Sequence, residues 1–212
     1  MAHGWASRAE GEYSMAIGDC MRATGKGAFA QGLGDVLSLW KGNAKGDYSH
    51  SEGGYTWADG KGSHAEGEST EALADYSHAE GRLTQASGLY SHAEGYGTIT
   101  TGAGSHAAGT YNLEDTTVSE DNPMGTYASI IGNGISNKVR SNAYTLDWAG
   151  NAWYAGTVEA EAIVLRSSTP GSKKKFALTV DDNGIVSVNE LEETTINIMQ
   201  YVYGDGIVNS NN

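Results

Sequence analysis

The segment Ser63-His64-Ala65-Glu66-Gly67 decides the fold of this 212-residue chain, because it recurs at a fixed spacing. It returns at residues 77–81 and 91–95, and near copies stand at residues 49–53 and 105–109. Successive copies are 14 residues apart. Self-similarity at a fixed period is the signature of a repeat architecture in which each unit packs on its neighbours.

Glycine marks a finer period of seven residues in the same region. It occupies 14 of the 16 positions, seven apart, that run from Gly4 to Gly109, and only Leu39 and Ala74 interrupt the series. Alanine stands two residues before 13 of these 16 positions. Small residues therefore alternate with larger ones, as in a strand with one closely packed face. A helix is not expected, since each Gly would cost it about 1 kcal/mol relative to Ala.

We therefore expect each seven-residue unit to be a short strand and a turn, and two units to form one 14-residue coil of a narrow solenoid. About eight coils fit into residues 1–109, and strands about 4.8 Å apart would make a rod roughly 35–40 Å long. Ala, Ser and Gly bury little apolar area, so one solenoid alone has a weak core. We expect identical chains to associate around a closed axis and bury the outward-facing ladder, in a number that the residues alone leave open.

The repeat resembles two known groups of proteins. Its Ser-x-Ala-x-Gly units resemble the head repeats of trimeric autotransporter adhesins (YadA-like), and the Tyr-Ser-His-Ala-Glu-Gly version resembles repeats in tail fibres and appendages of bacteriophages that infect Gram-positive hosts. The likeness covers nearly all of residues 5–109. It implies an all-β protein whose residues 1–110 form a left-handed parallel β-roll solenoid, and which is a homotrimer.

The second half of the chain differs in kind. Residues 111–126 are polar with a turn signal at Asn122-Pro123, which predicts a loop or neck. Residues 127–212 are expected to form a smaller, antiparallel, β-rich domain. In it, strand-like runs at 142–148 and 152–158 flank one turn, and Asp181-Asp182-Asn183-Gly184 is typical of a β-hairpin between 176–180 and 185–188.

A second resemblance falls in this half. Residues 130–134 and 140–153 are similar to a segment that follows such head repeats in phage and prophage tail proteins. In part of that family a self-cleaving chaperone domain comes next, marked by an acidic, aromatic-rich motif. That motif is missing from this chain, so the resemblance does not imply autoproteolysis here.

Composition excludes several function classes. The net charge of −13 repels nucleic acid and anionic membrane surfaces, so neither is an expected partner. No run of about 18 apolar residues is present for insertion into a membrane. The single cysteine, Cys20, has no partner for an internal disulfide and is expected to be a packing residue.

Histidines at 14-residue spacing suggest a metal site. Stacked coils would place them in a column, beside a parallel column that contains Glu66, Glu80 and Glu94. Metal sites need ligands that converge on one point, however, whereas a ladder spreads them along a line. Stacking and hydrogen bonding is therefore the favoured interpretation, and metal binding the less favoured one for the five candidates His50, His64, His78, His92 and His106.

We expect no enzymatic activity, no catalytic residue and no cofactor. Ser, His and acidic residues are abundant, but a catalytic site needs one set of residues with different roles at a single place. Five equivalent copies along the chain indicate a structural role instead. Aromatic side chains with a polar group suit a surface that contacts water and saccharides. The candidate ligand-binding residues, for each of which packing is the favoured alternative, are Trp57, Tyr76, Tyr90, Tyr96, Trp148 and Trp153.

Together these patterns predict a structural and adhesive protein of a phage tail fibre, or a receptor-binding protein. It would be made in the host cytoplasm, reside in the virion, contact other tail proteins and attach as a multivalent homotrimer to a bacterial surface polysaccharide or another host receptor. Two alternatives remain open. One is a tail enzyme that degrades polysaccharide or processes itself, and the other is a purely architectural spacer in the tail.

Overall fold

The computed structural model describes residues 1–34, 43–160 and 163–191, in which strands are the only regular elements. The chain divides into two compact units, Met1–Thr157 and Val158–Asn212. The predicted boundaries at residues 110 and 126 fall within the first unit, and residues 192–212 of the predicted C-terminal domain lie outside the described residues. Within the described ranges no helix is long and apolar enough to cross a membrane.

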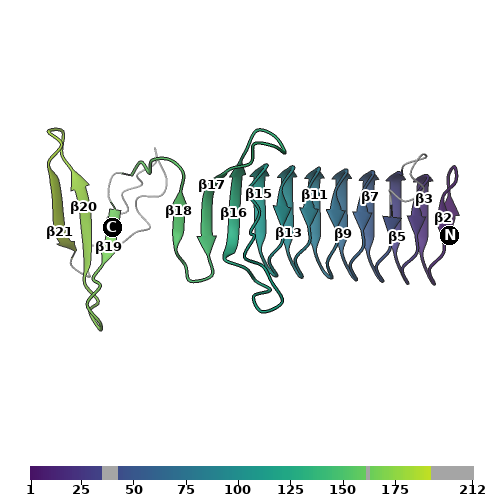
Figure 1. The fold of residues 1–212 in the computed structure, drawn as a ribbon, viewed down its shortest axis with the longest axis horizontal. Helices are drawn as coiled ribbons and strands as arrows, with labels where there is room; N and C mark the ends of the chain where they lie inside the picture. The colour runs from purple at the N-terminus through teal and green to yellow at the C-terminus, as the bar shows by residue number, and fades with distance from the viewer. Residues whose placement is uncertain (35–42, 161–162, 192–212) are drawn as a thin grey trace, which may run out of the picture. The chain divides into compact units, whose positions relative to one another are not determined.

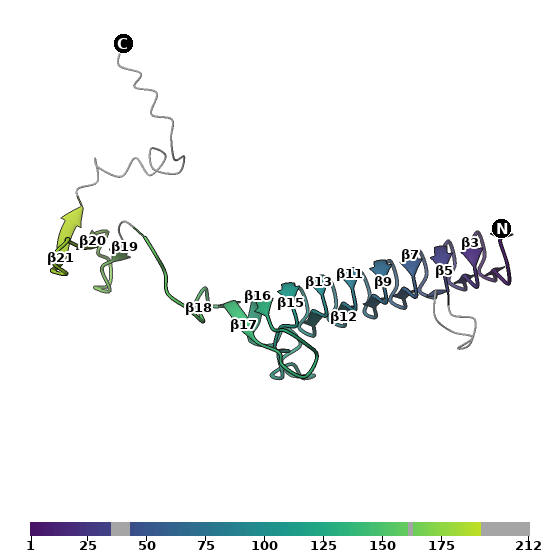
Figure 2. The same ribbon diagram turned by 90° about the horizontal axis from the view of Figure 1, so that it is seen from above.

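The first unit is a β-solenoid of about seven turns of about 14 residues (Figure 1), as the repeat predicts. Each coil contributes one strand to each of two parallel sheets, and Figure 2 presents the coils one after another along the roll. The first sheet contains β1 (Ala2–His3), β3 (Met15–Asp19), β5 (Phe29–Leu33), β7 (His50–Gly54), β9 (His64–Glu68), β11 (His78–Arg82), β13 (His92–Tyr96) and β15 (His106–Thr110). The second contains β2 (Arg8–Ala9), β4 (Arg22–Ala23), β6 (Asn43–Ala44), β8 (Trp57–Ala58), β10 (Glu71–Ala72), β12 (Gln85–Ala86) and β14 (Ile99–Thr100).

One coil is longer than the sequence lattice predicts. Gly32 pairs with Gly53, and Ala23 pairs with Ala44, so this coil has 21 residues instead of 14. Seven extra residues preserve the phase of the glycine series, and the lattice position Leu39 lies outside the described residues. The expectation of about eight coils assumes 14 residues in every coil. The longer coil uses seven extra residues without adding a turn, so fewer turns form.

The interior of the roll is lined by methyl and hydroxyl groups. Ala65 and Ala79 on the first sheet and Ala58 and Ala72 on the second have no exposed surface. Serine closes a corner between the sheets, since the Ser63 hydroxyl donates to the Gly60 carbonyl at 2.7 Å. The predicted small-residue face is thus the inside of the roll. The hydroxyls of Ser77 and Ser105 donate to turn carbonyls in the same way, whereas the Ser49 hydroxyl has no partner within the described residues.

Glycine is required where one coil touches the next. Gly81 has a φ of +102°, in the left-handed region, and a Cβ built on it would run into the carbonyl oxygen of Gly95 in the following coil. Gly60 has an ordinary φ, but a Cβ there would collide with the carbonyl of Ala74. The two sets of lattice glycines therefore differ: one needs backbone freedom as well as space, and the other needs space.

The roll continues beyond the repeat. β16 (Tyr127–Asn133) pairs in parallel with β15, and β17 (Asn142–Asp147) and β18 (Ala152–Tyr154) add antiparallel strands to the same sheet. Between β15 and β16 lies the predicted loop, organised by Asp115. Burial would raise the pKa of Asp115, but hydrogen bonds from Thr117, Tyr127 and Thr126 outweigh burial and hold the pKa below its usual range.

The second unit is a small antiparallel sheet. Its strands are β19 (Ile163–Arg166), β20 (Lys175–Val180) and β21 (Val186–Leu191), with β20 in the centre. The Asp181–Gly184 turn joins β20 to β21, as predicted: the Asp181 carboxylate accepts from the N–H groups of Asn183 and Ile185, and Gly184 has a φ of +78°. The antiparallel C-terminal sheet is thus confirmed.

Replacing Gly81 with Ala tests the contact between coils. We expect Gly81→Ala to lower the free energy of unfolding by about 2–4 kcal/mol, because it strains the backbone and pushes two coils apart. The matched control is Gly54→Ala on β7, where φ is ordinary and the space is open, and the change should stay within about 1 kcal/mol. Chemical denaturation followed by circular dichroism measures both, and equal effects would contradict the packing described here.

Candidate functional site: the His–Glu ladder

The outward face of the first sheet carries two columns of ionisable side chains, which we call the His–Glu ladder. In each repeat the His and Glu flank a buried Ala or Ser, so strand alternation turns both side chains outward. Register then places each residue beside its equivalent in the next coil. The ladder consists of His50, His64, His78, His92, His106, Glu52, Glu66, Glu80 and Glu94.

The imidazoles form one continuous stack. From His50 to His92 neighbouring ring centroids are 4.6–4.7 Å apart and the rings are within 6° of parallel. Phe29 extends the stack at one end, 4.9 Å from His50, and His106 ends it with a ring tilted by 31°. The predicted histidine column is therefore present, with the spacing of the strands that carry it.

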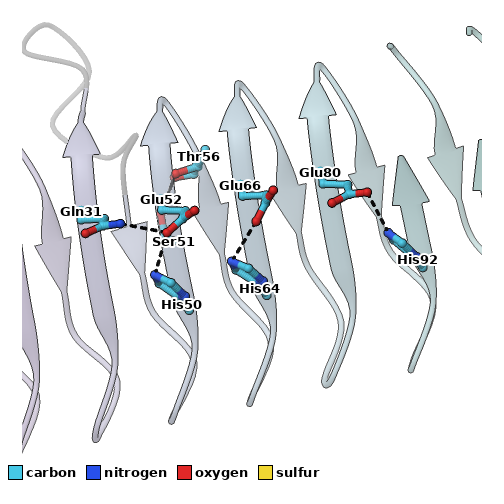
Figure 3. Close-up of polar contacts among 9 residues, drawn as sticks. All are labelled: Gln31, His50, Ser51, Glu52, Thr56, His64, Glu66, Glu80 and His92. Atoms are coloured by element: carbon cyan, nitrogen blue, oxygen red, sulfur yellow. Dashed lines mark hydrogen bonds and ion pairs between the residues drawn. The ribbon is translucent and has the colours of Figure 1, made fainter. Parts of the chain in front are cut away.

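The carboxylates lie close to the histidine Nε2 atoms without hydrogen-bonding to them. Glu52 and Glu66 approach the histidine of their own strand, with Nε2–Oε2 distances of 3.4 and 3.6 Å (Figure 3). Glu80 instead approaches His92 of the next coil, at 3.8 Å. The Nε2 atoms of all five ladder histidines are buried and have no hydrogen-bond partner within the described chain. Buried polar atoms without partners are rare in proteins and call for an explanation.

Burial and like charge govern the ionisation of the ladder. Burial lowers the pKa of His64 and of His92, and the neighbouring histidines lower them further. The nearby carboxylates oppose this shift. Burial raises the pKa of Glu80, as do a hydrogen bond with Glu94 and the charge of Glu66. The surroundings thus favour the neutral forms of His64, His92 and Glu80.

Gln31 indicates how the repulsion between adjacent carboxylates of the ladder can be reduced. It occupies the position that pairs with Glu52, and its side-chain amide donates to the Glu52 carboxylate at 2.8 Å (Figure 3). An amide next to a carboxylate supplies a donor and removes one negative charge. The sequence pattern gave no reason to single out Gln31, because it stands outside the Ser-His-Ala-Glu-Gly copies.

Four of the six candidate aromatic residues are distributed over different parts of the roll. Tyr76 and Tyr90 stack at one corner, with centroids 5.5 Å apart, and the Tyr76 ring lies against Gly62 of the preceding coil. Tyr96 packs edge-on against Tyr111. Trp57 lies on β8 of the second sheet and lines a hollow of about 330 Å³ with Arg22 and Lys45.

The other two, Trp148 and Trp153, lie near the end of the first unit and differ in role. The Trp148 indole donates to the Met124 carbonyl at 3.1 Å, so it fastens the loop before β16. Trp153 is 55% exposed and lines a groove of about 710 Å³. Other lining residues are Tyr127, Asn133, Asn142, Asp147 and Asn151.

The groove combines an aromatic surface with amide and carboxylate groups, which suits a polar ligand such as a saccharide. Its Asn and Asp residues were not predicted, because each falls at a strand end or turn where such residues are common for structural reasons. Asp147, for example, accepts hydrogen bonds from the N–H groups of Ala149 and Asn151 in its own turn. Only the fold brings these residues together around Trp153.

Comparisons with known proteins add no identity. No protein-family model matches the chain, and no curated protein matches it either.

Replacing Glu80 with Gln tests the repulsion in the ladder. At pH 7 we expect Glu80→Gln to raise the free energy of unfolding by about 0.5 kcal/mol, because the amide removes a charge between two carboxylates and can donate to Glu94. The gain should shrink as the pH falls through the raised pKa of Glu80, since protonation then removes the same charge from the wild type. Urea denaturation at pH 7 and pH 4 measures it.

The control for this variant is Glu71→Gln on β10. Glu71 pairs with Trp57 and Gln85, which are uncharged, so its neutralisation should leave the stability within about 0.5 kcal/mol. A lower stability of Glu80→Gln than of the wild type at pH 7 would contradict the electrostatic description.

Proposed function

We propose that this chain is a structural and adhesive protein of a bacteriophage tail fibre, which associates as a homotrimer and attaches to a bacterial surface polysaccharide. The solenoid would be left-handed, as in the adhesins whose repeats it resembles. Other tail proteins would be its further partners, and the virion its location. The observation that carries the proposal is the outward ladder on a roll whose own interior holds mostly small side chains.

The interior of one roll buries little apolar surface for the number of residues that it orders. Ala buries little apolar area, whereas ordering each residue costs about 1–2 kcal/mol. The parallel backbone hydrogen bonds hold coil to coil, but the ladder side chains remain about one-third exposed on the outside. Packing this face against identical faces around a closed axis would bury a repeated surface along the length of the roll.

The second unit has an exposed apolar face of its own, which supports association of identical chains separately from the ladder. Strand register puts seven apolar side chains on one face of its three-stranded sheet, and several are about half exposed. They are Ile163, Leu165, Phe176, Leu178, Val180, Val186 and Val188. A two- or three-stranded sheet needs a covered apolar face for stability. The same face of two further copies is the occupant that we propose.

A trimer also explains how weak sites would suffice for attachment. Three equal sites on one particle raise the effective concentration of each after the first has bound, so avidity exceeds the affinity of a single site. We propose the groove beside Trp153 as that site. Its volume of about 710 Å³ falls within the range of small-molecule sites, and its lining joins aromatic and polar groups.

Binding of the labelled full chain to Gram-positive cells and to their purified wall polysaccharides tests this function. We expect saturable binding that Trp153→Ala weakens about tenfold or more, because an aromatic residue at the centre of a site carries much of the binding energy. Trp5→Ala is the matched control: Trp5 is 61% exposed and lies outside the groove, so binding should not change.

The outcomes separate the alternatives. Binding that Trp5→Ala and Trp153→Ala leave equally intact would place the receptor site elsewhere. No binding to any host surface would favour a purely architectural spacer in the tail. Release of sugar from the polysaccharide would favour an enzyme.

A further inference from the structure

We propose that the His–Glu ladder binds divalent transition-metal ions of the zinc type, each held by two stacked histidines and the carboxylate beside them. This inference goes beyond attachment and does not depend on it. Three groups of described residues bring their ligand atoms within 4.8 Å of one another: His50–Glu52–His64, His64–Glu66–His78 and His78–Glu80–His92. We call these groups the first, second and third steps.

The donor set fits zinc. Two imidazole nitrogens and one carboxylate oxygen are a common zinc ligand set, in which water or another group completes the tetrahedron. Bonds of about 2.0–2.1 Å hold tetrahedral ligand atoms about 3.4 Å apart, so atoms of a step that lie up to 4.8 Å apart must approach by up to about 1.4 Å. No hydrogen bond holds any ladder Nε2 atom in place within the described chain, and the side chains are partly exposed, so rotation can supply this movement.

The unsatisfied Nε2 atoms are the second observation in favour of an ion. A neutral imidazole can present an unprotonated nitrogen to a metal. A cation would give these buried nitrogens a partner and neutralise adjacent carboxylates at once. The net charge of −13 further favours cations near the chain.

Sharing of histidines limits the number of ions. The first and second steps share His64, and the second and third share His78. One Nε2 atom binds one ion, so neighbouring steps exclude each other, whereas the first and third steps share no residue. A saturated ladder therefore holds two ions per chain. All ligands of a step come from one chain, so the expected number is two ions for each chain of the assembly.

Calorimetric titration of the full chain with Zn²⁺ at neutral pH tests the proposal, in a His3→Ala background that removes the one histidine outside the ladder. We expect two ions per chain. Glu52→Gln should reduce this to one, because the remaining second and third steps share His78. Glu80→Gln should likewise leave one. Glu66→Gln is the matched control and should keep two, since the first and third steps stay intact.

Two further measurements check the fold of each variant and the coordination geometry of the bound ion. Circular dichroism establishes that each variant retains the β-rich fold of the wild type. Substitution of Co²⁺ for Zn²⁺ should produce the intense visible absorption of a tetrahedral site with nitrogen ligands. A folded wild type that binds no Zn²⁺, or equal losses in Glu52→Gln and Glu66→Gln, would overturn the proposal.

Discussion

The two sheets of each coil lie close together, and nearly all of the side chains buried between them are small. Met21 is a larger side chain that is fully buried among them. Ala, Ser and Thr fill the interior from Ala16 to Ala107, and most of them have almost no exposed surface. Glycine at the corners then lets each coil approach the carbonyls of the next. The stability of the single chain therefore depends mainly on the parallel hydrogen bonds between coils, because the interior cannot grow into a large apolar core.

The narrow interior also determines the chemistry of the surface. Since inward positions hold mostly small residues, variation falls mainly on the outward positions, and a 14-residue period repeats each outward residue at strand spacing. One His and one Glu per repeat thus become a stack of imidazoles beside a column of carboxylates. Burial and the neighbouring histidines lower the pKa of His64 and of His92, and burial and the neighbouring carboxylates raise the pKa of Glu80. The regularity that builds the roll therefore also sets the electrostatics of its outward face.

Much of the roll could be predicted from spacing alone, because strand alternation and glycine corners leave direct marks in the sequence. The histidine column and the Asp181–Gly184 hairpin follow from such local rules. The 21-residue coil did not, since an insertion of seven residues preserves the phase of the lattice. Nor could the sequence bring Asn133 and Trp153 to one groove, because this depends on how the chain folds back on itself.

The central claim is that identical chains complete the roll by covering its outward ladder and the apolar face of the second unit. Light scattering of the purified full chain measures its mass in solution most directly. The account predicts three times the chain mass of 22.2 kDa, unchanged on dilution to micromolar concentration. A mass of one chain, with the β-rich circular dichroism spectrum intact, would contradict it.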